Sequence, residues 1–295
     1  MYSVNDIALE TWQVTGLQTR VATLGEGPVA LFIHGWPECW YCWREQMVAL
    51  ANAGYRAVAP DMPGFGETAS LPEISDYNVV RICAFMQELV EQANAGEPVL
   101  LIGHDWGAIN CWQFVQRHPE RVSRLINMSV PLRPMADIPP IEFLRGYFGE
   151  NFFYQIYFQQ PGVAEAEFDA DPEGILRRLG KPTEQPDWVT DEALNYYIDA
   201  YRHSGFAGGI NYYRNLDKNW RLMLPWRDSP ITCPVLFIVG SADMTIQGAS
   251  ENKLREMMSD RLPHVQIKML QGKGHWIQSE ATADVNAAML AFLAG

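Results

Sequence analysis

Short apolar runs alternate with amphipathic stretches along the first half of the chain, and Gly, Pro or charged residues bound each run. Such runs are typical of buried strands, and the stretches between them of helices. The predicted strands are Val29–His34, Arg56–Pro60, Pro98–Gly103 and Arg124–Val130, and the predicted helices are Tyr41–Ala53, Asp76–Ala93 and Trp106–His118. Strand–helix alternation indicates parallel strands joined by right-handed crossovers. We therefore expect an α/β fold with a mostly parallel central sheet flanked by helices.

Two segments near the N-terminus, Leu9–Val14 and Leu17–Leu24, flank a short Thr15-Gly16 turn. Two strand-like runs separated by two turn residues are typical of a β-hairpin. We expect this antiparallel hairpin to lead into the parallel sheet.

The strand pattern stops at about Pro131 and is absent as far as Pro225. Aromatic-rich, helix-prone segments such as Phe152–Gln159 fill this part, punctuated by Pro and Gly. The alternation then returns at Pro234–Gly240, Ala249–Met258, Val265–Leu270 and Ala283–Leu293. We interpret the middle part as an insertion: residues 1–130 and 226–295 form the core, and residues 131–225 form a helical cap.

The composition fits a globular protein with a substantial core, since 48% of the 295 residues are hydrophobic and 19% are charged. The formal net charge is −13. A polyanion repels phosphate backbones and anionic lipid surfaces, so we expect no nucleic-acid and no membrane partner. The first ten residues lack the basic and apolar parts of a secretory signal, and no run of about 18 apolar residues could span a bilayer. These features predict a cytoplasmic protein.

The five cysteines are odd in number and scattered along the chain, which argues against a disulfide framework. Cys39-Trp-Tyr-Cys42 matches C-x-x-C. A second pair with metal-ligand spacing is missing, so the pattern favours neither a redox dithiol nor a metal site.

The strongest chemical signal is Gly103-His104-Asp105-Trp106-Gly107, which follows an apolar strand and opens a helix. In the hydrolase elbow G-x-S-x-G, glycines flank a nucleophile on a strained strand-to-helix turn that presents its side chain at the end of the sheet. Here the nucleophile would be the carboxylate of Asp105. The amides and the dipole at the helix start favour its ionised form. The alternative is that Asp105 is simply the N-cap residue of the helix.

An Asp nucleophile forms an ester, and a base is needed to break that ester. Asp243 follows the apolar strand that begins at Val235, and His275 lies in a loop after the final strand. The chain order of nucleophile, acid and histidine is that of elbow hydrolases. Ligands gather at the carboxyl ends of parallel strands, so we predict a triad in which Asp243 orients His275. Taken singly, Asp243 is also typical of a turn cap and His275 of a surface loop.

The segment His34-Gly35-Trp36-Pro37 also follows an apolar strand. A loop in this place can supply one backbone N–H of an oxyanion hole, from Trp36, beside the N–H of Trp106. Trp36–Pro37 is a candidate cis peptide bond, because only X–Pro bonds adopt cis at low cost. An ordinary turn after a strand is the alternative. We expect His34 and His104 to support the site without reacting.

These motifs resemble those of the soluble epoxide hydrolases, and the resemblance covers nearly the whole chain. It rests on the segments His34-Gly-Trp-Pro-Glu-Cys-Trp-Tyr-Cys-Trp-Arg44, Asp61-Met-Pro-Gly-Phe-Gly66, Gly103-His-Asp-Trp-Gly107 and Gly274-His-Trp276. It implies an α/β-hydrolase fold with an inserted helical cap. It also implies that Cys39 and Cys42 are tolerated small residues before a helix.

The insertion contains two segments similar to the two cap-tyrosine segments of that family. They begin at Phe152 and at Asn211, and residue by residue Tyr154 and Tyr213 take the places of the two lid tyrosines. For a single tyrosine, packing on an aromatic helix face is the alternative. The residues expected to contact a hydrophobic substrate are Trp36, Trp106, Phe153, Tyr212, Met244 and Trp276.

The resemblance implies the hydrolysis of epoxides to vicinal diols without a metal or organic cofactor. Asp105 would attack one epoxide carbon while Tyr154 and Tyr213 hydrogen-bond the ring oxygen. A water activated by His275 would then hydrolyse the ester. The expected partners are a small hydrophobic epoxide and water, and a homodimer formed through the cap stays open.

Two other functions remain as alternatives. Haloalkane and haloacid dehalogenases share an Asp elbow, and Trp36, at a position where Phe is frequent in epoxide hydrolases, could join Trp106 in offering indole N–H groups to a halide. The tyrosine pair argues against this function, because a leaving halide needs no proton. A ligand receptor without catalysis on the same fold is the second alternative.

Overall fold

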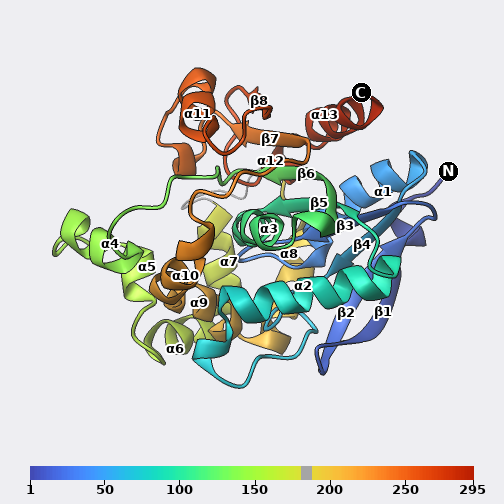
Figure 1. Ribbon diagram of the computed structural model, residues 1–295. Coiled ribbons are helices and arrows are strands. Elements are labelled where there is room, and N and C mark those ends of the chain that lie inside the picture. Colours follow the sequence, from blue (N-terminus) through green and yellow to red (C-terminus); the bar gives the residue numbers. More distant parts are fainter. Residues whose placement is uncertain (181–187) are drawn as a thin grey trace.

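The computed structural model describes residues 1–180 and 188–295, and a single sheet runs through the centre of this part of the chain (Figure 1). Its strand order is β1-β2-β4-β3-β5-β6-β7-β8. The strands are β1 (Ala8–Val14), β2 (Leu17–Leu24), β3 (Val29–Ile33), β4 (Arg56–Pro60), β5 (Val99–His104), β6 (Val122–Met128), β7 (Val235–Gly240) and β8 (Gln266–Leu270). The predicted α/β class with a mostly parallel sheet is confirmed.

The antiparallel pairs lie at one edge of the sheet. β1 and β2 form the predicted hairpin, and β2 also pairs antiparallel with β4. The hairpin turns at Thr15 and Gly16, whose φ angles are 50° and 81°. Two central residues with positive φ match the right-handed twist of the flanking strands. From β4 to β8 every neighbouring pair is parallel.

Six helices pack around the sheet within the described core. They are α1 (Arg44–Asn52), α2 (Val79–Asn94), α3 (Trp106–Arg117), α11 (Glu251–Met258), α12 (Ile277–Glu280) and α13 (Thr282–Ala294). Short 3₁₀ turns cover Val4–Asp6, Trp40–Trp43, Ile74–Asp76, Pro119–Arg121, Leu224–Trp226 and Met244–Ile246.

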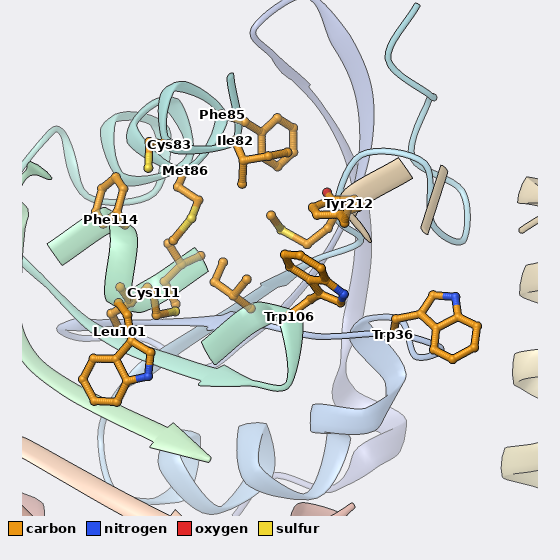
Figure 2. Packing of buried hydrophobic residues seen from close by; sticks show 14 of the residues in the cluster. Trp36, Ile82, Cys83, Phe85, Met86, Leu101, Trp106, Cys111, Phe114 and Tyr212 are labelled. Carbon is orange, nitrogen blue, oxygen red and sulfur yellow. The ribbon is translucent and has the colours of Figure 1, made fainter. Parts of the chain in front are cut away.

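Alternate residues of the strands point to two separate hydrophobic layers. Leu31 and Leu101 face α2 and α3, and Figure 2 shows side chains of these helices gathered with Leu101. Phe32 and Ile102 face the opposite layer, which contains residues of α1 and α13. A sheet covered on both faces explains why its strands read as continuous apolar runs.

Two predicted helix starts were wrong, and local hydrogen bonds explain one of them. The helix predicted from Asp76 begins at Val79, because the Asn78 side chain accepts hydrogen bonds from the amides of Val80 (3.0 Å) and Arg81 (3.3 Å) and so caps the helix there. The helix predicted from Tyr41 begins at Arg44, after the 3₁₀ turn of Trp40–Trp43.

The chain between β6 and β7 forms helices, and its described residues contain no strand. The helices are α4 (Pro140–Phe148), α5 (Tyr154–Tyr157), α6 (Val163–Ala170), α7 (Pro172–Gly180), α8 (Asp191–Ser204), α9 (Ala207–Arg214) and α10 (Leu216–Met223). Most of them gather on one side of the sheet as an inserted helical cap (Figure 1). No helix within residues 1–180 and 188–295 is long and apolar enough to cross a membrane.

Candidate active site

Loops that follow the carboxyl ends of four strands in the parallel part of the sheet carry the predicted reactive groups. Trp36 follows β3, Asp105 follows β5, Asp243 follows β7 and His275 follows β8. These strands share one sheet and are mutually parallel, so their carboxyl ends meet at one edge. This edge is where ligands bind in open α/β sheets.

Asp105 has the strained backbone expected of an elbow. Its φ and ψ angles are 53° and −120°, in a region of backbone conformation that residues other than glycine rarely adopt. Gly107 is required beside it, because a Cβ there would overlap the carbonyl of Ile33. Within the described residues, the Asp105 side chain makes no capping hydrogen bond to its helix. Its Oδ1 instead accepts a hydrogen bond of 2.8 Å from the amide of Trp36.

His275 lies between the two carboxylates. Its Nδ1 is 3.1 Å from both carboxylate oxygens of Asp243, and its Nε2 is 3.4 Å from Oδ2 of Asp105. Asp243 is buried, and its Oδ1 also accepts hydrogen bonds of 2.8 Å from the amide and the hydroxyl of Thr245. The structure therefore brings Asp105, Asp243 and His275 together in the predicted order.

The charges of the three groups stabilise one another. Burial lowers the pKa of His275, but the hydrogen bonds and charges of Asp105 and Asp243 outweigh it and raise that pKa to about 10. Burial raises the pKa of Asp105, yet His275 and the Trp36 amide bring it below its usual value. Burial also raises the pKa of Asp243, but His275 and the hydrogen bonds from Thr245 outweigh it and bring that pKa below its usual value. At neutral pH the site thus holds an imidazolium between two carboxylates.

The backbone of the loop after β3 is fixed by its histidine. Burial lowers the pKa of His34 to about 4, so the ring is neutral. Its Nδ1 donates to the carbonyl of Gly35 (2.9 Å) and its Nε2 accepts from the amide of Met62 (2.9 Å). The Trp36–Pro37 bond is cis. These contacts hold the Trp36 amide against Asp105.

The two cap tyrosines lie next to each other, above the tryptophans that flank Asp105. The rings of Tyr154 and Tyr213 are 5.6 Å apart, and Tyr213 packs edge-on against Trp106 at 5.0 Å and Trp36 at 5.9 Å. Burial, aided by the charge of Asp105, raises the pKa of Tyr154 to about 12. Burial and the charges of Tyr154 and Asp105 also raise the pKa of Tyr213. Both phenols therefore keep their protons at neutral pH and lie within the field of Asp105.

The other predicted substrate contacts lie in different surroundings. Phe153 stacks on Phe148 at 4.1 Å, beside Tyr154. The Tyr212 hydroxyl donates to the carbonyl of Pro63 (3.3 Å), and its buried ring lies beside Trp106 (Figure 2). Met244 is 74% exposed.

Trp276, the residue after His275, lines an apolar pocket. Its ring is 6.1 Å from that of Trp188, and Leu176, Leu194 and Tyr197 line the same pocket. Pro37 lines it too, so the pocket adjoins the loop that holds Asp105.

A buried polar network beneath His275 was not found from the sequence. Nε2 of His104 is 2.9 Å from the carbonyl oxygen of His275, and Nδ1 of His104 is 3.1 Å from Glu38. The Gln278 amide donates to both oxygens of Glu38 (3.1 and 3.0 Å). Glu38 directly follows the Trp36-Pro37 motif and so gave a local signal, whereas Gln278 gave none. Among the described residues, no cluster of three or more His, Cys, Asp or Glu side chains is arranged to hold a metal ion.

Comparisons with known proteins agree with this geometry. A family model described as the α/β hydrolase fold matches residues 28–282. Epoxide hydrolase A of Mycobacterium tuberculosis is 36% identical, over 95% of each chain, and epoxide hydrolase 2 of Siraitia grosvenorii is 35% identical, over 96% of this chain and 97% of its own. The crystal structure of epoxide hydrolase A from Mycobacterium thermoresistibile matches with a TM-score of 0.92 and 35% identity over 98% of both chains. An epoxide hydrolase of Vigna radiata matches with a TM-score of 0.93 and 32% identity over 99% of both chains.

Proposed function

This chain belongs to the epoxide hydrolases of the α/β-hydrolase family, and we propose that it converts epoxides to vicinal diols through a covalent ester of Asp105. The observation that carries this mechanism is the ionised carboxylate of Asp105, held on a strained elbow between the imidazolium of His275 and the Trp36 amide. In this proposal residues 226–295 complete the core begun by residues 1–130, and the described residues between 131 and 225 form the cap above it.

Ring opening is the first chemical step. One oxygen of Asp105 attacks an epoxide carbon, the bond from that carbon to the ring oxygen breaks, and the developing alkoxide takes a proton from Tyr154 or Tyr213. An alkoxide is far more basic than the phenolate of Tyr154, whose phenol has a pKa of about 12, so this proton transfer is favourable. Nε2 of Gln155 donates to the Tyr154 oxygen (2.9 Å), which leaves the phenol proton free to be donated. The product is a neutral ester of Asp105.

Ester formation changes the charge next to His275. The free enzyme holds His275 protonated, because two carboxylates raise its pKa to about 10. Once Asp105 is a neutral ester, only Asp243 remains to support the imidazolium, so the pKa of His275 falls and its proton returns to the tyrosine through water. The same event that creates the ester thus creates the base that removes it.

Ester hydrolysis is the second step. Neutral His275 takes a proton from water, and the hydroxide attacks the carbonyl carbon of the Asp105 ester. The amides of Trp36 and Trp106 stabilise the oxyanion, and loss of one such donor typically costs ~2.7–4 kcal/mol of transition-state stabilisation. The diol leaves, Asp105 is again ionised and His275 is again protonated, so charges and protons balance over one turnover.

The apolar pocket beside Trp276 supports a hydrophobic epoxide as the substrate. Trp188, Leu176 and Leu194 line it with apolar surface, which suits an aryl or alkyl substituent on the epoxide. The cytoplasmic location and the cap-mediated homodimer stay predictions.

One observation favours dehalogenation as a second candidate. The indole Nε1 of Trp36 is buried and has no hydrogen-bond partner among the described residues. An N–H group that donates a hydrogen bond to a halide would be unpaired in this way before the halide binds. The indole of Trp106, in contrast, donates to Tyr213, which offsets only part of the rise that burial causes in the pKa of that phenol. A paired indole and two phenols suit an epoxide oxygen better than a halide.

The deciding experiment measures diol and halide in parallel. The purified protein receives styrene-type, alicyclic and fatty epoxides in one series and chloro- and bromoalkanes in the other, with Asp105→Ala as the inactive control. Diol without halide supports the proposed function. Halide without diol would assign dehalogenation, and thermal stabilisation by these compounds without either product would assign a receptor.

A further inference from the structure

The segment that carries Tyr154 has little local structure to hold it in place. α5 is a single turn of four residues, and an isolated turn of this length is unstable in water. Tyr213 lies near the end of α9, a separate helix. The distance between the two phenols therefore depends on contacts that join α5 to α9.

Arg214, the residue after Tyr213, makes most of those contacts, and every donor of its guanidinium has an acceptor. Nε donates to the carbonyl of Phe158 (2.8 Å), and Nη2 donates to the carbonyl of Gln160 (3.0 Å). Nη1 donates to Oδ1 of Asn211 (2.8 Å). The remaining hydrogens of Nη1 and Nη2 go to the two carboxylate oxygens of Glu165, the second at 2.9 Å.

Two of these five acceptor atoms are the carbonyls that end the Tyr154 segment, and two more are the carboxylate oxygens of Glu165, the first-turn acid of α6. The Arg214 side chain is 4% exposed and that of Glu165 is 14% exposed. Burial raises the pKa of Glu165, but Arg214 outweighs this and brings it below its usual value, so the pair is ionised. A buried, bidentate pair with planar geometry fixes position more strictly than a surface ion pair.

A second contact runs the opposite way, from a side chain of the Tyr154 segment to the backbone of α9. The side-chain amide of Gln159 donates to the carbonyl of Tyr213 (3.1 Å) and to the carbonyl of Gln155 (2.8 Å). The segment from Tyr154 to Glu165 is thus bound to the end of α9 through both the Tyr213 carbonyl and the Arg214 side chain.

We propose that Arg214 and Glu165 are positioning residues that set the separation of the Tyr154 and Tyr213 hydroxyls for ring opening. This inference rests on the proposed function. Neither residue acts on the substrate, and both act through the backbone that carries the phenols. Misplacement of a catalytic group by about 1 Å can reduce a rate on the order of 10²-fold. Once the tyrosine has taken its proton back from His275, ester hydrolysis uses His275 and Asp243 and not the phenols, so its rate should be unaffected.

The test separates the two half-reactions in Arg214→Lys, which keeps the charge and loses the planar fork. Single-turnover quench with intact mass measures the rate of ester formation and the rate of ester loss. We expect ester formation to slow by about 100-fold and ester loss to stay within about twofold of the wild-type rate. The matched control is Arg202→Lys on cap helix α8, whose side chain is 59% exposed and pairs with Asp199. It should change neither rate.

Several outcomes would overturn the inference. Equal ester formation in Arg214→Lys and wild type, or proportional losses in both half-reactions, would mean that Arg214 has no specific positioning role. If Arg214→Lys does not fold in a thermal melt, Glu165→Gln, which keeps the shape and removes the charge, is measured in the same way with the same expected split. If the wild-type protein gains no mass with any epoxide, the proposed function itself has failed, and that result does not depend on Arg214.

Discussion

Gly35 lies against the nucleophile so closely that a Cβ on it would stand 2.8 Å from Cγ of Asp105 and nearer still to Cβ and Oδ1. This absence of a side chain lets the loop after β3 approach β5 and brings the Trp36 amide to 2.8 Å from Oδ1. The oxyanion donor and the nucleophile therefore pack directly against each other. A methyl group between them should push them apart and disturb both functions.

The first prediction concerns Gly35→Ala. We expect diol formation to fall by about 10²- to 10³-fold, because the added methyl displaces either the Trp36 amide or the Asp105 carboxylate. The control is Gly146→Ala in α4, where a Cβ meets open space. That variant should keep its activity and gain up to about 1 kcal/mol of stability, since Ala is the better helix former. Diol assays and thermal melts of both proteins check this, and an active Gly35→Ala would contradict it.

Replacing the base should trap the intermediate. In His275→Gln the carboxylate of Asp105 still attacks the epoxide, but water is no longer activated, so the ester should accumulate. Intact mass is expected to rise by the mass of one substrate within the first turnover. A mass that stays unchanged during incubation with a substrate of the wild-type enzyme would count against the scheme.

The phenols should matter for ring opening and hardly for ester hydrolysis. We expect Tyr154→Phe and Tyr213→Phe together to slow ester formation at least 10²-fold, at the lower end of what general acid catalysis contributes. Tyr157→Phe is the matched control, because Tyr157 lies on the same short helix and its hydroxyl donates to Glu167 (2.6 Å). Rapid-quench measurement of both half-reactions decides the matter. Loss of ester hydrolysis with intact ring opening would reverse the assigned roles.

The charge of Asp105 should control the titration of His275. In the wild-type protein the pKa of His275 is about 10. Asp105→Asn carries no charge, as the ester does, and we expect it to lower that pKa. NMR titration of the imidazole measures it, with His118, which directly follows the end of α3, as the internal reference. The same pKa for His275 in both proteins would refute the proposed switch.

The charge interaction between Asp105 and His275 also makes the stability of the folded protein depend on pH. The folded-state pKa of His275 lies above its unfolded value of about 6.5, so the stability it contributes is fully present below that pH and is lost as the pH rises through about 10. We therefore expect the melting temperature to fall more between pH 7 and pH 10 in the wild type than in Asp105→Asn.

The sequence predicted the parts of the site that depend on local chain geometry. Gly103 to Gly107 is a five-residue motif whose glycines are needed for steric reasons, so Asp105 was readable from its neighbours. The placement of Asp243 and His275 follows from the rule that carboxyl ends of parallel strands meet at one edge. In the same way the apolar runs predicted the central strands, because β3, β5 and β7 are buried on both faces.

Contacts between distant residues were not readable. Glu38 and Gln278 are 240 positions apart and meet only in the folded chain. The sequence also placed Tyr212 beside Tyr213 as a substrate contact, yet successive helix residues point about 100° apart. The Tyr212 hydroxyl accordingly turns to Pro63 in the core. Nothing in the sequence singled out Arg214, because four of its five acceptor atoms come close only once α5, α6 and α9 are packed together.

The most direct test of the account is a single turnover in water enriched in ¹⁸O, with enzyme in excess over epoxide. If Asp105 forms the ester, water attacks its carbonyl carbon, so the label enters the peptide that contains Asp105 and the first diol carries none. A labelled diol from an enzyme whose Asp105 peptide stays unlabelled would mean that water opens the epoxide directly, and the covalent mechanism would be wrong.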